Sequence, residues 1–257
     1  MREENGRSSG NEGMFWGRNS VLELLASGRD IDKIYVQKGA VEGSIKVIVG
    51  KAAARRIPIV ETDRSRLDTI SGGAVHQGVA ASVPETVYLA VDDLFGAAEK
   101  RGEKPFFVIC DGINDPHNLG AIIRTAECAG AHGVIIPKHR SVSLTSTVAK
   151  SSAGAIFRVP VARVNNIASA IADLQQRGVW VYALEANGKP YFGEKFDDSG
   201  IAFVLGSEGE GVSRIVKEKS DFVLSIPMYG ELNSLNVSAA AAVMLFEAAR
   251  QRHGKGE

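Results

Sequence analysis

The amino-acid sequence predicts an α/β protein in which a small α/β domain precedes an open, mostly parallel sheet. Two observations carry this prediction. After Pro105, apolar runs recur with hardly any polar interruption, at residues 106–110, 134–136, 179–184, 201–205 and 222–226. Such runs are expected of parallel strands that are covered on both faces. Helical patterns, notably at residues 167–177 and 234–250, accompany these runs and complete the pattern of an open α/β domain.

The smaller domain is predicted from shorter elements that precede residue 84. A helix is expected at 19–28, where Asn19 can cap its start and Gly28 can end it. A second helix is expected at 44–56, and short strands are expected at 34–36, 57–60 and 79–83. We therefore place a first domain at residues 14–84 and a second at 105–257. Residues 85–104 contain five acidic residues and one short amphipathic stretch, and we interpret them as a linker.

Composition narrows the class of protein. The longest apolar run, residues 239–246, is shorter than the ~18 residues that a membrane span needs. Residues 1–13 are polar and rich in Gly and Ser, so we expect a disordered tail and no secretory signal. Cys110 and Cys128 are too few for a disulfide framework and are expected to be buried free thiols. The histidines are scattered without metal-ligand spacing. We expect a cytoplasmic protein without metal.

Charge is balanced in total but unevenly distributed. Lys and Arg number 30, as do Asp and Glu, so the formal net charge is zero, which alone argues against nucleic-acid binding. However, residues 128–172 contain no acidic residue and include Arg140 and Lys150. A second basic group comprises Lys51, Arg55 and Arg56. From charge alone, a nucleic-acid-binding surface and an ordinary solvated face both stay open.

The turns that follow the predicted strands are informative, because ligands of open parallel sheets bind beyond the carboxyl ends of the strands. The first such turn opens the segment DGINDPHNLGAIIRTAE, residues 111–127. Pro116 prevents further strand pairing, and Asn118 can cap a helix that begins near Leu119. An ordinary strand-to-helix turn accounts for these residues. Arg124, in an otherwise apolar helix, is either a paired core charge or a binder of phosphate or carboxylate, and we favour binding.

The second turn is GSEGEG, residues 206–211. Glycines allow positive φ and a close approach of the backbone to a ligand. The spacing is not that of the dinucleotide-binding GxGxxG motif, and a tight turn is the ordinary explanation for such a run. Glu208 is unexpected, because it places a carboxylate in this flexible cradle.

The third turn belongs to IPMYGELNSLNVSAAAA, residues 226–242. Four polar side chains crowd the start of an Ala-rich helix there, at Asn233, Ser234, Asn236 and Ser238. Capping of the helix accounts for one or two of them. The others indicate a site.

Taken in order, the three turns resemble the signature motifs of the SpoU family of RNA 2′-O-ribose methyltransferases. The matching segments are DPHNLGAIIRTA, LGSEGEG and IPMYGELNSLNVSAAAA, and the resemblance extends over residues 105–253. The start of the first domain, MFWGRNSVLELL, resembles the RNA-binding module that precedes the catalytic domain in one branch of the family. The resemblance implies a SPOUT-like fold with a carboxyl-terminal trefoil knot. It also implies a homodimer whose site draws residues from both subunits.

The same resemblance implies that S-adenosylmethionine is the methyl donor. Its expected contacts are Leu205, Gly206, Gly209, Ile226, Met228 and Leu235. The matching catalytic positions are Asn118, Arg124, Glu208, Ser234 and Asn236. For RNA we expect contacts from Lys51, Arg55, Arg56, Arg140 and Lys150. Since a guanidinium with a pKa above ~12 is a poor base at neutral pH, we expect Arg124 to hold a phosphate rather than to accept the hydroxyl proton.

The substrate is left open by the sequence. The added amino-terminal module favours a guanosine of large-subunit (23S) ribosomal RNA. The alternatives are tRNA, a resistance-type ribosomal methyltransferase, and a non-catalytic RNA-binding protein on the same fold. A nicotinamide or nucleotide enzyme lacks the expected glycine spacing.

Overall fold

The computed structural model describes residues 13–40, 42–84, 88–197 and 199–254, and the expected tail at 1–13 lies almost wholly outside them. The described residues form two compact units. The first combines the described residues up to and including Pro84 with Ser143–Phe157. The second combines Tyr88–Val142 with the residues from Arg158 onward.

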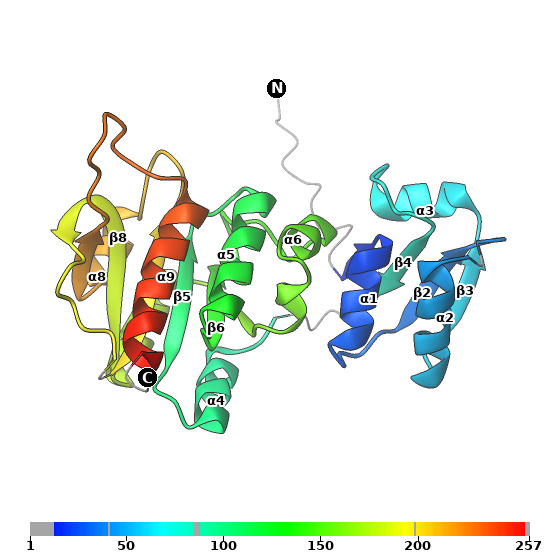
Figure 1. The fold of residues 1–257 in the computed structure, drawn as a ribbon, viewed down its shortest axis with the longest axis horizontal. Coiled ribbons are helices and arrows are strands. Elements are labelled where there is room, and N and C mark those ends of the chain that lie inside the picture. Colours follow the sequence, from blue (N-terminus) through cyan, green and yellow to red (C-terminus); the bar gives the residue numbers. More distant parts are fainter. Residues whose placement is uncertain (1–12, 41, 85–87, 198, 255–257) are drawn as a thin grey trace. The chain divides into compact units, whose positions relative to one another are not determined.

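The first unit is built on a sheet that has four strands in the described part of the chain, in the order β1-β4-β2-β3. Strand β4 pairs antiparallel with β1 and with β2, whereas β2 and β3 are parallel. The predicted helices and strands of this unit are present, and β1 and α3 are added to them (Figure 1). Asn19 does not cap α1, because it lies within the helix and Gly17 is the N-cap residue. The elements are β1 (Met14–Trp16), α1 (Arg18–Ala26), β2 (Lys33–Gln37), α2 (Ser44–Ala54), β3 (Ile59–Thr62), α3 (Arg64–Ser71) and β4 (Val79–Ser82).

A segment from much later in the chain completes the first unit. It contains α6 (Ser146–Ser151) and a 3₁₀ helix (Ala155–Phe157). The fully buried Oγ of Ser146 accepts a hydrogen bond from Trp16 N and donates one to Trp16 O, both at 3.1 Å. The rings of Phe15 and Phe157 pack edge to face at 5.0 Å. Segment 143–157, which we placed in the second domain, is thus part of the core of the first unit.

The second unit contains a sheet of six strands among the described residues, in the order β10-β8-β9-β5-β6-β7. Every neighbouring pair is parallel, which confirms the predicted open parallel sheet. The trefoil knot stays a prediction. The strands are β5 (Phe106–Asp111), β6 (Gly133–Pro137), β7 (Val161–Val164), β8 (Val179–Pro190), β9 (Gly200–Gly206) and β10 (Phe222–Ser225).

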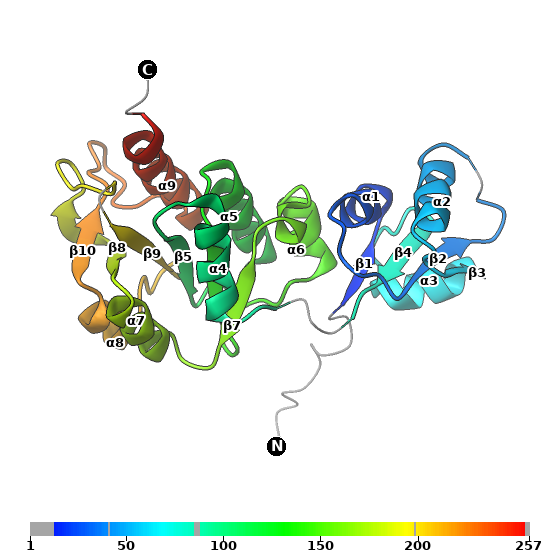
Figure 2. The same cartoon turned by 90° about the horizontal axis from the view of Figure 1, so that it is seen from below.

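Helices cover both faces of this sheet (Figures 1 and 2). On one face α5 (Pro116–Cys128) and α9 (Val237–His253) lie side by side. On the other face α4 (Val91–Arg101), α7 (Ile167–Gln176) and α8 (Arg214–Lys219) share one apolar cluster with the strands. Burial on both faces explains why the strands read as nearly continuous apolar runs.

Part of the predicted linker is folded into this second unit. Leu94 and Phe95 of α4 are buried, and the ring of Phe95 packs edge to face on Phe107 at 5.1 Å. Gly133 makes room for α4, because a Cβ there would overlap the side chain of Leu94. The amphipathic stretch within residues 85–104 is therefore a core helix, and residues 85–87 lie outside the described residues.

Candidate active site

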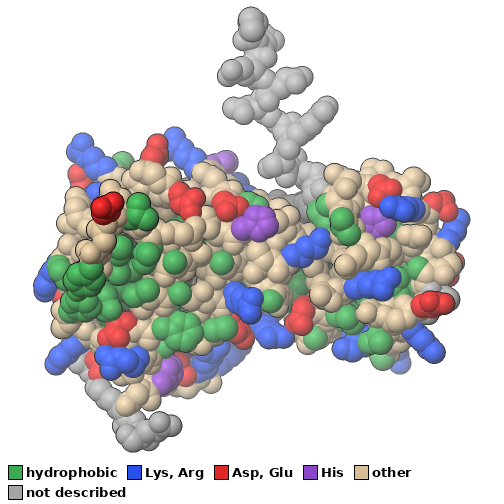
Figure 3. Space-filling model, turned by 45° about the horizontal axis from the view of Figure 1, so that its top comes forward, with side chains coloured by type: hydrophobic (Ala, Val, Ile, Leu, Met, Phe, Trp, Pro, Cys, Tyr) green, Lys and Arg blue, Asp and Glu red, His purple; other side chains and the backbone are tan. Residues whose placement is uncertain are grey.

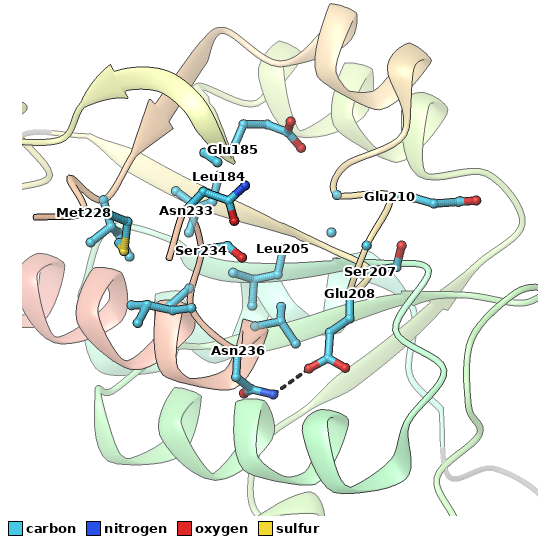
Figure 4. A pocket seen from close by; sticks show the side chains of 18 of the residues that line it. Leu184, Glu185, Leu205, Ser207, Glu208, Glu210, Met228, Asn233, Ser234 and Asn236 are labelled. Atoms are coloured by element: carbon cyan, nitrogen blue, oxygen red, sulfur yellow. Dashed lines mark hydrogen bonds between the residues drawn. The ribbon is translucent and has the colours of Figure 1, made fainter. Parts of the chain in front are cut away.

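A cavity of about 630 Å³ lies at the carboxyl end of β9, between the last part of β8 and the segment that leaves β10 (Figure 4). Residues 184–186, 205–211 and 233–237 supply most of its lining. Ligands of open parallel sheets bind at this edge, and small-molecule sites typically measure about 300–1,000 Å³. The second and third sequence turns thus meet around one cavity.

The glycine-rich turn at the end of β9 is closed by its own backbone. Ser207 N donates to Gly211 O, and Gly211 N donates to Ser207 O, both at 3.0 Å. Gly206 lies against the far end of this turn, where a Cβ would overlap the backbone of Gly211 and Val212. We expected Gly206 to give a ligand access to the backbone. The structure adds a stronger requirement, since only glycine fits between the two ends of the turn.

Three polar side chains from distant parts of the sequence meet at the cavity. Oε1 of Glu208 accepts hydrogen bonds from Nδ2 of Asn118 at 3.0 Å and from Nδ2 of Asn236 at 2.5 Å. Nδ2 of Asn236 also donates to Oδ1 of Asn118 at 3.1 Å. Figure 4 shows the carboxylate of Glu208 turned towards Asn236 at the start of α9. Oε2 of Glu208 has no hydrogen-bond partner among the described residues and is free to accept one from a ligand.

Asn236 serves the helix and the site together. Its Oδ1 accepts hydrogen bonds from Ser238 N at 2.9 Å and from Ser238 Oγ at 2.6 Å, so that it caps α9. Its Nδ2 remains for Glu208. The surplus of polar residues at this helix start is thus partly explained, because one side chain performs both tasks.

Two carboxylates that the sequence analysis missed anchor the backbone beyond the turn. Oε1 of Glu185 accepts from Val212 N at 2.7 Å, and its Oε2 pairs with Nζ of Lys217 at 3.3 Å. Oδ2 of Asp111 accepts from Ser213 N at 2.8 Å. Glu185 belongs to no distinctive motif, and Asp111 opens the segment 111–127 without a role being assigned to it from the sequence. Only the parallel arrangement of β5, β8 and β9 brings both carboxylates to this turn.

The expected site residues fall into two groups. The six expected cofactor contacts and three of the expected catalytic residues, Glu208, Ser234 and Asn236, line the cavity. Asn118 joins them through Glu208. Arg124 does not line the cavity. It lies on α5 six residues after Asn118, and its side chain is exposed. Its exposure makes the alternative of a paired core charge wrong.

The expected RNA-binding residues differ in their surroundings. Arg55 donates to the carbonyl oxygens of Leu25 at 2.8 Å and Arg29 at 2.5 Å, so its guanidinium ties parts of the first unit together. Lys51, Arg56 and Lys150 are at least partly exposed in the first unit, and Arg140 is exposed in the second. Figure 3 shows cationic and anionic side chains interspersed over the visible face. On this face, charge type alone therefore marks no RNA surface.

The cysteines do not take part in the cavity. Burial, and then the charge of Asp111, raise the pKa of Cys110 to about 12, so that it stays a thiol. Cys128, expected to be buried, is exposed at the end of α5. In the described ranges no cluster of three or more His, Cys, Asp or Glu side chains could hold a metal ion. Within the same ranges no helix is long and apolar enough to span a membrane.

Two family models match separate parts of the chain. The model described as the SpoU rRNA Methylase family matches residues 105–246. The model described as RNA 2′-O ribose methyltransferase substrate binding matches residues 15–89. Both ranges agree with the similarity that the three motifs and the amino-terminal segment indicated.

Whole-length relatives and solved structures are similar as well. A protein of Bacillus subtilis (strain 168), YacO, whose name assigns it to the TrmH family of tRNA/rRNA methyltransferases, is 44% identical over 94% of this chain and 96% of its own. An AdoMet-bound rRNA methyltransferase from Sinorhizobium meliloti superposes with a TM-score of 0.74 at 25% identity, covering 93% of this chain and 87% of that one. The SpoU methyltransferase AviRb from Streptomyces viridochromogenes superposes with a TM-score of 0.77 at 22% identity. The match covers 98% of this chain and 95% of that one, and it supports the fold.

The close approach at Gly206 predicts the effect of a single methyl group. Gly206→Ala should lower the free energy of unfolding by about 1–3 kcal/mol, because the backbone on both sides of the contact is fixed. Gly230→Ala is the matched control, since its Cβ would meet nothing within 4 Å and should cost little. Denaturant unfolding of both variants measures the difference. Equal stability of the two would contradict the role given to Gly206.

Proposed function

This chain belongs to the SpoU/TrmH family of RNA methyltransferases, and from this premise we propose that it transfers the methyl group of S-adenosylmethionine to a ribose 2′-hydroxyl of structured RNA. The observation that carries the proposal is the hydrogen-bonded cluster of Glu208, Asn118 and Asn236 at the cavity. It combines an oriented carboxylate with two amides at the edge of the sheet where a ligand is expected.

The cavity fits the methyl donor in size and in lining. Leu205, Ile226 and Leu235 offer apolar contacts for an adenine ring, and the turn 206–211 offers backbone groups for its polar edge. When bound, S-adenosylmethionine supplies a sulfonium methyl group as the electrophile. A pocket that is apolar with a few convergent polar groups suits such a cofactor.

The polar cluster is proposed to hold the ribose in line with the methyl group. With the methyl donor bound, the 2′-oxygen would form a bond to the methyl carbon as the carbon–sulfur bond broke, and the hydroxyl proton would pass to an acceptor at the site or to water. Oε2 of Glu208 is available to accept a hydrogen bond from this hydroxyl, while Asn118 and Asn236 fix the carboxylate through Oε1. Ser234, which lines the same cavity, is proposed to orient the ribose or the methionine part of the cofactor.

The RNA is proposed to be large-subunit (23S) ribosomal RNA, with a guanosine as the target. The substrate-binding family model at residues 15–89 and the rRNA methylase model at residues 105–246 support this choice. The name of the Bacillus relative covers both tRNA and rRNA, so tRNA is the alternative. Either substrate implies a cytoplasmic enzyme. Lys51, Arg56, Arg140 and Lys150 are proposed as RNA contacts on the basis of their exposed charges.

A second copy of the chain is the proposed partner of α9. Ala239, Val243 and Phe246 are exposed on this helix, and Val243 and Phe246 are 37% and 50% exposed. Their spacing forms an apolar stripe on the side of α9 that faces solvent. Since α9 begins at the cavity with Asn236, a copy docked on this stripe would lie next to the site. The family resemblance points to the same partner.

Arg124 is proposed to bind the phosphate next to the target ribose. It is exposed on α5, which packs beside α9, so it is accessible to RNA and to a second copy of the chain. The cavity lining itself contains Glu185, Glu208 and Glu210 but, among the described residues, no Lys or Arg. A cation from outside the lining is therefore needed to hold a phosphate there.

The methyl-transfer proposal predicts two measurable activities. The purified protein should bind S-adenosylmethionine or S-adenosylhomocysteine in calorimetry without RNA. It should then add 2′-O-methyl groups to unmodified 23S ribosomal RNA of Bacillus subtilis, with bulk tRNA as the competing substrate. Binding without methylation of either RNA would favour the non-catalytic alternative, and no binding at millimolar cofactor would refute the assignment.

The dimer proposal predicts that a charge on α9 separates the subunits. Phe246→Glu should convert a dimer into monomers in sedimentation experiments, because the buried charge would lack a partner. Val47→Glu is the matched control, since Val47 is also 50% exposed but lies in the first unit. A wild-type protein that sediments as a monomer at micromolar concentration would exclude the dimer.

The role of Arg124 can be tested by its pH profile. A phosphate-binding Arg needs charge and a planar fork, whereas a base needs a removable proton. Arg124→Lys and Arg124→Ala should therefore be similarly slow in single-turnover methyl transfer, with cofactor binding intact. If Arg124 were the base, the Lys variant would recover activity as the pH approached about 10, where a solvated lysine side chain loses its proton. Such recovery would overturn the phosphate-binding role.

A further inference from the structure

The loop at residues 72–78 of the first unit is held in a fixed conformation. His76 is buried at its centre, with Nε2 3.1 Å from Oδ1 of Asp68, and its Nδ1 accepts a hydrogen bond from Gly78 N at 3.0 Å. On either side of His76 the chain turns outward, so that Val75 is 74% exposed and Gln77 adopts a φ of 54°. A left-handed conformation at a residue other than glycine costs energy and persists only where its surroundings impose it.

Two cations from distant parts of the sequence are fastened to this loop. Gln77 accepts two hydrogen bonds from Arg18. Its Oε1 accepts one from the backbone N of Arg18 at 2.9 Å, and its backbone oxygen accepts one from Arg18 Nε at 3.1 Å. Nζ of Lys150 donates to Val75 O at 3.2 Å. Carbonyl oxygens two residues apart therefore fix the positions of a guanidinium and an ammonium group.

The fold brings Lys150 to this position through α6. Ser146, one helical turn before Lys150, is tied to the backbone of Trp16 by its two hydrogen bonds. Residues four apart share a helix face, so Lys150 lies beside the next residue, Gly17. A Cβ on Gly17 would approach Cε of Lys150 at 3.3 Å and Oε1 of Gln77 at 3.6 Å. Glycine at this position therefore leaves room for both side chains.

Both cations keep their charge available. Within the described residues neither Arg18 nor Lys150 has a carboxylate partner, and their carbonyl partners orient them without neutralising them. Lys38 in the same unit differs, because Asp63 pairs with it at 3.2 Å. The amide nitrogen of Gln77 also lacks a hydrogen-bond partner in the described part of the chain, and it adds a donor beside the two charges.

We propose that Arg18, Gln77 and Lys150 bind the sugar-phosphate backbone of the RNA that the second unit methylates, and this inference rests on the proposed function. Two separated cations with fixed donors suit phosphate oxygens, to which Arg presents a planar fork and Lys a point charge. Exposed Val75 supplies an apolar contact for a ribose or a base at the edge of the same surface. The surface unites residues 18, 75–77 and 150, and in it Lys150 acts together with Arg18 rather than with Arg140, with which the sequence pattern grouped it.

The experiment measures binding of full-length protein to a 23S ribosomal RNA transcript of Bacillus subtilis at several salt concentrations. Arg18→Gln and Lys150→Gln should each lower the slope of log affinity against log salt by about 1, and the double variant by about 2, because each phosphate contact releases counterions. Lys38→Gln is the matched control and should keep the wild-type slope. Gln77→Gly, which relieves the backbone conformation and removes the amide, should weaken binding without changing the slope.

The remaining outcomes separate this inference from the proposed function. Lys150→Arg, which keeps the charge, should retain RNA binding. If Lys150→Arg and Lys150→Gln both lost RNA binding and both had a lowered unfolding midpoint, Lys150 would be a structural residue and the inference would be overturned. A double variant with the wild-type salt slope would also overturn the inference. The alternative would then be that this surface binds an acidic protein. Calorimetry with S-adenosylmethionine tests the methyltransferase assignment independently, since none of these residues lines the cavity.

Discussion

The backbone of Gly206 packs directly against that of Gly211 and Val212, and the geometry of the cavity depends on this contact. It allows the turn after β9 to fold back on itself, with the backbone hydrogen bonds between Ser207 and Gly211 closing it. Glu185 and Asp111 then hold the chain that leaves the turn. The result is a rigid base from which Glu208 extends towards α5 and α9. A carboxylate can be oriented by two asparagines only if its own backbone is fixed in this way.

The cavity and the surface at Arg18 and Lys150 hold charge in opposite ways. Around the cavity, carboxylates are bound by backbone N–H groups or amides, as Glu185 and Glu208 are. In the first unit, Arg18 and Lys150 are bound by carbonyl oxygens. A net charge of zero therefore conceals a local asymmetry, because a carbonyl partner positions a cation and leaves its charge intact. Recognition of RNA by a neutral chain needs no excess of basic residues if the available cations are placed in this manner.

Much of the fold could be predicted from the sequence, because strands buried on both faces carry a signal that is local. The turns after β5, β9 and β10 could be identified for the same reason, and they contain the residues that meet at the cavity. What could not be predicted depends on tertiary contacts. Leu94 reads as part of a polar linker until its packing beside Gly133 is known. Cys128 lies beyond the buried stripe of α5, which ends at Ala126. Glu185 belongs to no motif, and Ser146 reveals its attachment to the first unit only through Trp16.

Arg124 shows that a residue can be proposed from the sequence while its surroundings in the fold stay unknown. Its place in an apolar helix suggested a buried charge or a binding group, and its exposure excludes the buried charge. The cavity lining, as far as the structure describes it, carries three glutamates and no Lys or Arg, so a phosphate beside it would be stabilised by a cation from another part of the protein. Arg124 belongs to the helix beside α9, whose outer stripe of Ala239, Val243 and Phe246 is apolar. A copy docked on that stripe would bury the apolar residues and bring a second Arg124 near the same surface. The dimer proposed through α9 would meet both the need for a cation and the exposure of this helix face, because its site would draw on two chains.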